Sequence, residues 1–176
     1  GVGALAAAVA GYYRGLFGDS RPVMTVVEPD RAACLYESAR QGTGQARSVG
    51  GDLDTIMAGL ACGDPSPIAW EILDHCADFF LSCPDFVAAK GMRVYAVPVS
   101  GDPFIVSGES GAVTLAAMMY IVEHESLQDL KRRMKLGPDS QILLINTEGN
   151  TYPGHFRRVV WEGSDPVPQE YRFPLV

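Results

Sequence analysis

Two glycines separated by one residue open the chain, in the stretch "GVGALA" (1–6). Glycines at a helix start leave backbone N–H groups accessible to an anion, because no side chain covers them. "GVGALA" also nearly fits the dinucleotide fingerprint G-x-G-x-x-G/A, and Glu28 stands where a ribose-binding acid belongs, although the printed sequence holds no strand before Gly1. Gly1 and Gly3 equally suit close packing of a helix on a strand. The residues alone leave a pyrophosphate, a single phosphate and no ligand as alternatives.

Two later turns also carry polar groups. In "SGESGA" (107–112), glycines permit a tight turn into a helix, and Glu109 places a carboxylate there. Ser110 equally suits a helix N-cap. Thr147 follows the apolar run of "LLINTEGNT" (143–151), and its hydroxyl can bond either a ligand or its own turn.

The remaining titratable residues lack the spacing of a metal or catalytic cluster. Asp52 and Asp54 lie in a glycine-rich loop, where acids usually serve turns. His75, His124 and His155 are isolated, and none has a partner at ligand spacing. We therefore predict no metal site and three histidines that are structural or solvated.

Composition and charge narrow the class of protein. The chain has 176 residues, 47% of them hydrophobic, and a formal net charge of −7. This charge disfavours nucleic acid and membrane surfaces as partners, because binding phosphates needs a basic surface. The four cysteines have no C-x-x-C spacing, which disfavours zinc and favours a cytoplasmic location. A disulfide between Cys34 and Cys62 stays open as an alternative.

Helical and strand patterns alternate along the chain. We expect helices at 4–17, 30–42, 84–98, 109–124 and 126–135, a helix at 67–83 whose last residues could be strand, and strands at 22–29, 105–106 and 140–147. The helix at 4–17 is apolar nearly all round, so it should be largely buried. Asp30 is expected to cap the second helix and Gly42 to end it. This alternation predicts an α/β fold, layered as a three-layer sandwich around a mainly parallel sheet.

Four separated motifs carry a resemblance to a known family. They are "VVEPDRAACLY" (26–36), "GDLDTIMAGLACGDPS" (51–66), "SGESGAVTLAAM" (107–118) and "LLINTEGNT" (143–151). In this order they resemble the fold type II pyridoxal-phosphate enzymes, the family of tryptophan synthase β and threonine dehydratase. Within that family the chain is most similar to the diaminopropionate ammonia-lyases.

The resemblance implies a pyridoxal 5'-phosphate site. Its phosphate would lie on the glycine loop formed by Gly1, Val2, Gly3, Ala4 and Leu5. Gly108 and Glu109 would stand beside the cofactor ring, with the role of Glu109 left open. Thr147 matches the Ser/Thr that faces the pyridine nitrogen in this family. The substrate would be a small amino acid, and the complete enzyme would be a homodimer.

The resemblance also implies a Schiff-base lysine. Lys90, Lys131 and Lys135 are the lysines of the chain, and none stands in the family's lysine context. We therefore expect residues 1–176 to be one α/β domain, the C-terminal part of the enzyme from the glycine loop onward, without a catalytic residue and inactive alone.

The implied reaction is α,β-elimination of 2,3-diaminopropionate to pyruvate and ammonia in the complete enzyme. A serine/threonine dehydratase-like lyase is an alternative from the same chemistry. An NAD-binding module and a non-catalytic remnant that associates with a partner chain are alternatives from other classes.

Overall fold

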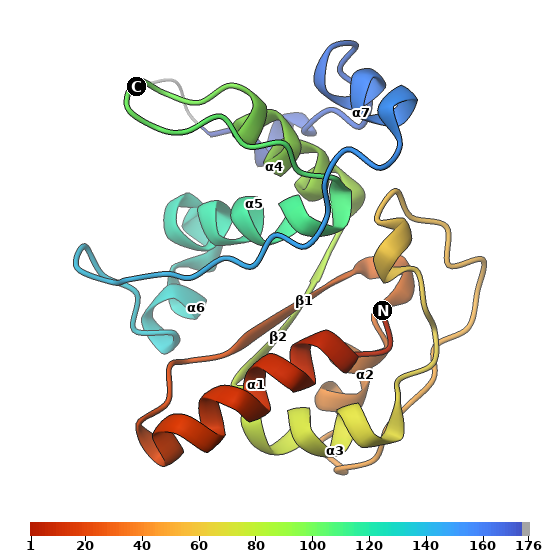
Figure 1. Cartoon of the computed structure of the whole chain (residues 1–176), viewed down its shortest axis with the longest axis vertical. Helices are drawn as coiled ribbons and strands as arrows, with labels where there is room; N and C mark the ends of the chain where they lie inside the picture. The colour runs from red at the N-terminus through yellow and green to blue at the C-terminus, as the bar shows by residue number, and fades with distance from the viewer. Residues whose placement is uncertain (174–176) are drawn as a thin grey trace. The chain divides into compact units, whose positions relative to one another are not determined.

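Two short parallel strands form the sheet of the computed structural model, which describes residues 1–173 (Figure 1). Strand β1 (Thr25–Pro29) pairs with β2 (Phe79–Cys83), in a register that runs from Thr25 opposite Phe79 to Pro29 opposite Cys83. Helices α2 (Cys34–Gln41) and α3 (Pro67–Cys76) lie in the connection between the two strands. The expected α/β fold with a parallel sheet is therefore confirmed.

The chain divides into two compact units, Gly1–Pro84 and Asp85–Val176. The first unit contains both strands together with α1 (Ala4–Phe17), α2 and α3. The second contains α4 (Asp85–Ala96), α5 (Glu109–Glu123), α6 (Gln128–Arg133) and α7 (Pro153–Val160). Short 3-10 turns occupy Gly18–Ser20, Asp30–Ala32, Ala58–Leu60, Glu125–Leu127 and Gln169–Tyr171. Over residues 1–173, no helix has both the length and the apolar character needed to span a membrane.

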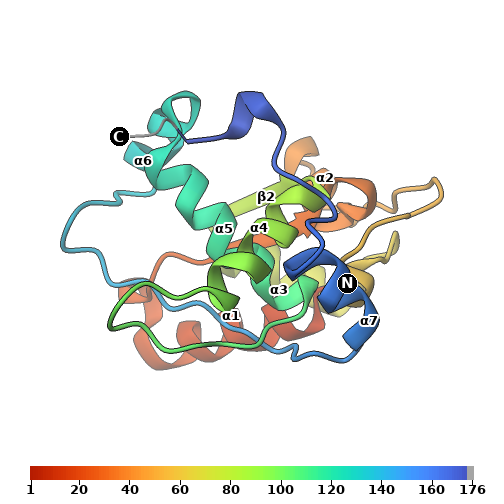
Figure 2. The ribbon, with the colours of Figure 1, turned by 90° about the horizontal axis from the view of Figure 1, so that it is seen from above.

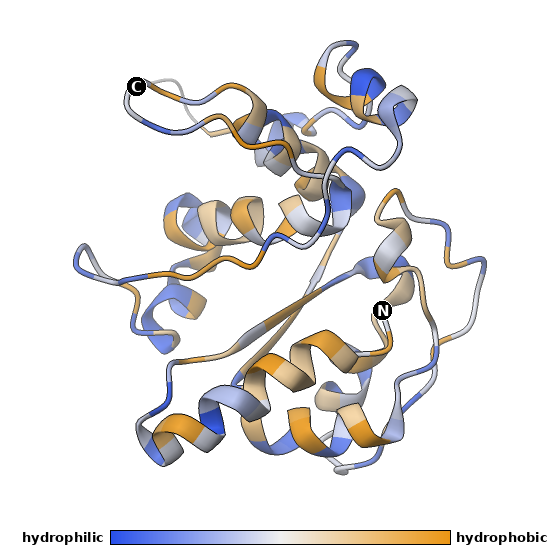
Figure 3. Cartoon of the chain, in the orientation of Figure 1, coloured by the Kyte–Doolittle hydropathy of each residue, from blue (hydrophilic) through white to orange (hydrophobic). Residues whose placement is uncertain are grey.

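Helix α1 has the bounds expected from its alanine-rich sequence and ends at Gly18, whose φ is 55°. Its burial differs from the expectation. Ala7 and Ala10 are buried in the core of the first unit, whereas Leu5 and Leu16 are more than half exposed. Figure 3 shows apolar residues along much of this helix. The prediction of a largely buried helix is wrong because α1 packs mainly on α3, and one neighbour covers one stripe of a helix.

Helix α2 begins later than expected. Asp30 starts a 3-10 turn (Asp30–Ala32), and the N-cap of α2 is Ala33, which offers no side-chain hydrogen bond. Asp30 is therefore not the cap of this helix. The predicted end is confirmed, because Gly42 adopts φ 62° and its N–H donates to the carbonyl of Ala39.

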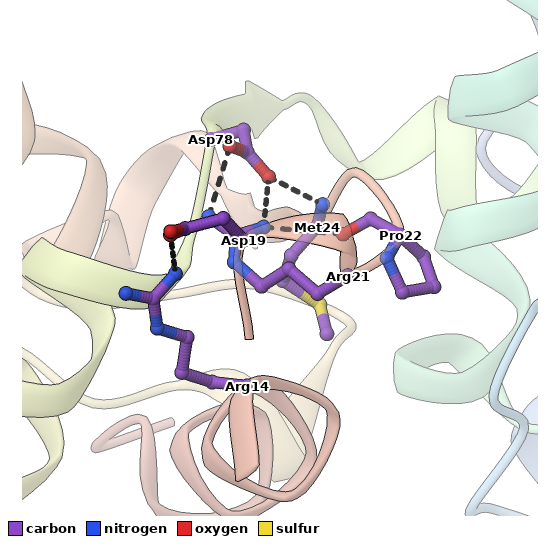
Figure 4. Close-up of polar contacts among 6 residues, drawn as sticks. All are labelled: Arg14, Asp19, Arg21, Pro22, Met24 and Asp78. Carbon is purple, nitrogen blue, oxygen red and sulfur yellow. Dashed lines mark hydrogen bonds and ion pairs between the residues drawn. The ribbon is translucent and has the colours of Figure 1, made fainter. Parts of the chain in front are cut away.

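A bidentate ion pair joins the segments that lead into the two strands (Figure 4). Both terminal nitrogens of Arg21 donate to the carboxylate of Asp78, at 2.6 and 3.1 Å. The same carboxylate accepts the N–H of Met24 at 2.7 Å, and the carbonyl of Met24 accepts the N–H of Asp78. These contacts hold the starts of β1 and β2 side by side.

In the second unit, α4 and α5 pack closely against each other (Figure 2). Gly91 lies at their crossing, and a Cβ there would come 2.1 Å from the carbonyl oxygen of Ala112. The glycine therefore allows the two helix backbones to approach each other. The expected helices at 84–98, 109–124 and 126–135 are present, with α6 shorter than expected.

The strand expected at 140–147 is absent from the described structure. This segment is irregular, and Ile142, Leu143 and Ile145 are exposed. The short strand expected at 105–106 is also absent. A strand needs a neighbour for its ladder, and in residues 1–173 strand pairing occurs between β1 and β2 only. Helix α7, by contrast, was not expected from the sequence.

Candidate functional site

The glycine loop leads directly into helix α1. Gly3 is the N-cap of this helix with φ 94°, a conformation that favours glycine. No side chain caps the helix, and its first turn contains no acidic residue. The N–H groups of the first turn therefore lack side-chain acceptors, and together with the helix dipole they suit an anion. Val2, Ala4 and Leu5 are exposed at this helix start.

The two glycines also have structural reasons of their own. A Cβ on Gly3 would come 3.2 Å from side-chain carbons of Leu35 and Leu73, and a Cβ on Gly1 would lie 3.2 Å from the carbonyl oxygen of Gly59. The carbonyl of Val2 accepts the N–H of Ser66 at 2.9 Å. Close packing of the loop is therefore a sufficient reason for both glycines, and an anion is not needed to explain them.

Glu28 does not have the setting of a ribose-binding acid. Its side chain is buried, and its two carboxylate oxygens accept the N–H groups of Leu35 at 3.2 Å and Tyr36 at 2.7 Å. Burial raises the pKa of the Glu28 carboxyl, and these two backbone bonds oppose the rise. Glu28 thus caps helix α2 from within the first unit, which removes the residue on which the dinucleotide interpretation depended.

In the second unit, the segment around Thr147 is tied to the start of α5. The carbonyl of Glu148 accepts the N–H of Gly108 at 3.0 Å, and its carboxylate accepts the N–H of Ser110 at 2.6 Å. On the other side of Thr147, the amide oxygen of Asn146 accepts the hydroxyl of Ser107 at 3.0 Å. Thr147 is exposed between these two anchors. The segment around Thr147 is therefore held against the start of α5 by its two neighbours, Asn146 and Glu148.

Two glycines of α5 make room for these anchors. A Cβ on Gly108 would lie 2.5 Å from Cδ of Glu148, and a Cβ on Gly111 would lie 2.1 Å from the amide oxygen of Asn146. The backbone of Gly108 has φ −75°, which any residue can adopt. Both positions therefore require glycine for close approach, and the neighbours that approach are side chains of this chain.

Glu109 has a partner that the sequence analysis missed. Oε1 of Glu109 lies 3.2 Å from Nε2 of His155, and their side chains are 11% and 15% exposed. Nε2 has no aligned hydrogen-bond partner in residues 1–173, so this contact is one of ion-pair distance. Burial raises the pKa of the Glu109 carboxyl. A backbone hydrogen bond at Glu109 and, after it, His155 oppose the rise, and the nearby Glu148 carboxylate adds to it. His155 was predicted to be structural or solvated, and the sequence did not indicate its contact with Glu109.

One signal in the sequence pointed to this arrangement. Pro153 is favoured at the first position of a helix, and it occupies the start of α7. A helix predicted from Pro153 would have carried His155 in its first turn. Its pairing with α5 still depends on packing.

Two of the three lysines contact groups of the second unit. The ammonium of Lys90 lies over the rings of Tyr120 at 4.4 Å and Phe173 at 3.3 Å, and burial lowers its pKa. Nζ of Lys131 donates to the carbonyl of Val122 at 3.0 Å. All four cysteines are free thiols, so the alternative of a Cys34–Cys62 disulfide is wrong.

Residues 1–148 match the family model described as "Pyridoxal-phosphate dependent enzyme". Two curated relatives are similar over most of the chain. Diaminopropionate ammonia-lyase of Escherichia coli (strain K12) is 48% identical over 95% of this chain and 42% of the relative. The enzyme of the same name from Salmonella typhimurium (strain LT2) is 43% identical over 93% of this chain and 41% of the relative. The chain thus spans about two fifths of the length of these relatives.

Solved structures give the same likeness. The Escherichia coli diaminopropionate ammonia lyase in complex with an aminoacrylate-PLP azomethine reaction intermediate superposes with a TM-score of 0.86 at 45% identity, over 96% of this chain and 42% of that chain. Threonine deaminase isoform 2 from Solanum lycopersicum superposes with a TM-score of 0.70 over 93% of this chain and 42% of that chain. Its identity is 18%, so that likeness concerns the fold alone.

Proposed function

Because this chain belongs to the pyridoxal-phosphate dependent enzyme family, we propose that it supplies part of the pyridoxal phosphate site of a 2,3-diaminopropionate ammonia-lyase. The observation that carries the proposal is the 48% identity to such an enzyme over 95% of the chain. The threonine deaminases and serine racemase of the same fold are 18–21% identical, which supports the ammonia-lyase over the dehydratase-like alternative.

We propose that Gly1, Val2, Gly3, Ala4 and Leu5 hold the phosphate of the cofactor. The uncapped N–H groups at the start of α1 and the absence of an acid from its first turn support this role. Backbone donors at a helix start hold a phosphate without lysine or arginine, so the net charge of −7 is no obstacle. The donors present therefore fit the phosphate of this cofactor.

Gly108, Glu109 and Thr147 are proposed to face the cofactor ring. When bound, pyridoxal phosphate supplies an electron-withdrawing ring that makes the α-proton of an amino acid acidic. The hydroxyl of Thr147 is a neutral partner for a ring nitrogen, because it does not force that nitrogen to stay protonated. The bonds of Asn146 and Glu148 hold the chain on either side of Thr147 against the start of α5, which supports this placement.

The base of the elimination is not assigned to this chain. Lys90 and Lys131 are engaged with neighbours of their own unit, and none of the three lysines of the chain stands in the family's lysine context. The proposal therefore takes the Schiff-base lysine from outside these 176 residues. We further propose a cytoplasmic homodimer: four free thiols suit a reducing compartment, and the dimer follows from the family resemblance.

The activity is tested with the protein produced from its natural coding region. It is loaded with pyridoxal phosphate and given 2,3-diaminopropionate, with L-serine as the comparison substrate. We expect one pyruvate and two ammonia molecules for each 2,3-diaminopropionate consumed, and little pyruvate from serine. Equal rates on both substrates would support the dehydratase-like alternative, and tight NAD binding without any response to pyridoxal phosphate would refute the proposal.

The phosphate contact is tested separately with Ala4→Glu. A carboxylate at the start of α1 suits the helix dipole, so the helix should gain about 0.3–1 kcal/mol. The same charge repels a phosphate, and we expect the affinity for pyridoxal phosphate to fall at least about tenfold, or about 1.4 kcal/mol. Ala8→Glu is the matched control, because Ala8 is also exposed but lies one turn further along. Equal losses of affinity in both variants would contradict the assignment.

The ring contact is tested with Thr147→Val, which keeps the shape and removes the hydroxyl. The loss of one hydrogen bond should weaken cofactor binding about two- to tenfold and shift its absorbance band. Thr151→Val, in the same segment, is the control and should change neither the affinity for the cofactor nor its absorbance band. An unchanged affinity and spectrum in Thr147→Val would remove this residue from the proposed site.

A further inference from the structure

A buried carboxylate at the start of α5 requires a compensating partner. Glu109 is 8% exposed, and an ionised carboxyl with so little contact with water is costly unless a donor or positive charge faces it. Its own helix start helps, because a negative group suits the positive end of a helix. The side chain that faces it from another element is His155 of α7, at 3.2 Å.

The contact made by the other ring nitrogen, Nδ1, decides which nitrogen of the neutral imidazole carries the proton. Nδ1 of His155 lies 3.2 Å from a terminal nitrogen of Arg158, one turn along α7. A guanidinium has only donors, so Nδ1 must carry the lone pair in this contact. The neutral ring then has its proton on Nε2, and the protonated ring has one there too. The Arg158 contact therefore favours the Nε2–H tautomer of the neutral ring, and this nitrogen lies at ion-pair distance from the carboxylate of Glu109.

The ring is also held in its plane. Tyr152 stacks on His155, with ring centroids 6.1 Å apart and planes 20° apart. Arg158 and Tyr152 thus restrain the imidazole from two sides, while α5 and α7 are the elements that it joins. A restrained imidazole that presents a fixed N–H is a means of orienting a carboxylate.

We propose that His155 is a positioning residue for Glu109: its imidazole, with Nε2 at 3.2 Å from Oε1, favours the ionised form of the Glu109 carboxylate at the start of α5. The consequence for the cofactor ring rests on the proposed function, in which Glu109 stands beside that ring. Two charged or titratable side chains face Glu109 from other segments, His155 from α7 and Glu148 from the segment after Thr147. They act in opposite directions on its pKa, so removal of His155 leaves the backbone hydrogen bond at Glu109 to oppose burial and the repulsion of Glu148.

The coupling is measured first without any cofactor. The protein from its natural coding region is labelled with ¹³C at glutamate carboxyls, and the Glu109 signal is identified by its loss in Glu109→Gln. We expect His155→Phe to raise the pKa of Glu109 by about one unit, because the ring stays but its N–H is lost. His155→Gln, which keeps an N–H donor, should restore at least half of that shift. His75→Phe is the control, since His75 is exposed in the first unit and contacts its own helix.

Arg158 supplies an independent variant, because it is exposed and its replacement leaves the packing of α7 intact. The ¹⁵N signals of His155 should show the Nε2–H tautomer in the parent protein. In Arg158→Met the Nδ1–H tautomer should gain population. An unchanged Glu109 pKa in folded His155→Phe, or a dominant Nδ1–H tautomer in the parent protein, would overturn the inference.

The cofactor-loaded protein separates this inference from the proposed function. With pyridoxal phosphate bound, the pH at which the cofactor absorbance changes should shift in His155→Phe and not in His75→Phe. Failure of the parent protein to bind pyridoxal phosphate would refute the proposed function, while the Glu109 pKa comparison would still decide the role of His155. Suppose that His155→Phe binds the cofactor normally and changes neither the pKa of Glu109 nor the pH at which the cofactor absorbance changes. That result would refute the inference about His155 and leave the proposed function intact.

Discussion

Gly108→Ala tests whether a side chain of this chain occupies the space beside the start of α5. An added Cβ would lie 2.5 Å from Cδ and 2.6 Å from Oε2 of Glu148, so this flexible side chain must move away. It would then lose its 2.6 Å bond from the N–H of Ser110. A hydrogen bond to a charged group contributes about 1.5–3 kcal/mol. The backbone at Gly108 accepts alanine, whose lower unfolded-state entropy returns about 0.4–1 kcal/mol.

The expected net loss for Gly108→Ala is therefore about 1–2 kcal/mol. Amide hydrogen exchange of α5 reports this free energy for the helix concerned. In a Glu148→Ala background the obstructing side chain is gone, so Gly108→Ala should there stabilise the helix by about 0.4–1 kcal/mol. This reversal of sign is the diagnostic result of the double-mutant cycle. An equal loss in both backgrounds would show that Glu148 is not what requires glycine at this position.

Three further predictions concern packing, thiols and acid stability. Gly91→Ala should destabilise the second unit by at least about 3 kcal/mol in a urea titration. Its Cβ would lie 2.1 Å from the backbone carbonyl oxygen of Ala112, which cannot move aside as a flexible side chain can. A loss of stability below about 1 kcal/mol would contradict this close packing. Cys62 should react first with a thiol reagent, since it is half-exposed and the other three cysteines are buried. Burial raises the pKa of Cys34 and of Cys83 to about 12, so four thiols that react equally fast in the native protein would be inconsistent with this burial. Burial alone would raise the pKa of Asp78, but the bonds from Arg21 and a backbone N–H outweigh it, so the net pKa is lowered. The stabilisation from this carboxylate is therefore present above about pH 4 and lost as pH falls further. Asp78→Asn should be less stable at pH 7 and lose less stability on acidification, and an unchanged dependence of stability on acid pH would disprove this.

Much of the first unit was predictable from local sequence. The alanine-rich run and Gly18 determine the bounds of α1, because helix propensity and the left-handed conformation of glycine are local properties. Gly42 ended α2 for the same reason. The start of α2 was not predictable, since a carboxylate from the preceding strand, Glu28, satisfies its first N–H groups in place of Asp30.

The second unit shows the limit of pattern recognition. The apolar run at 142–145 has the composition of a buried strand, but composition does not supply the neighbouring strand that a ladder requires. The glycines at 108 and 111 were predicted to permit a tight turn into a helix. What approaches them, the side chains of Glu148 and Asn146, followed only from the structure.

The amino-acid sequence by itself determined most of the helical segments, with α7 the exception, and the motifs by which the chain resembles pyridoxal-phosphate enzymes, because these depend on neighbours along the chain. Tertiary structure alone decided that Glu28 faces α2, that Glu109 meets His155, and that Thr147 lies between two anchors. Each of those contacts joins residues from separate elements. Their distances depend on how helices and loops pack, which no local preference specifies.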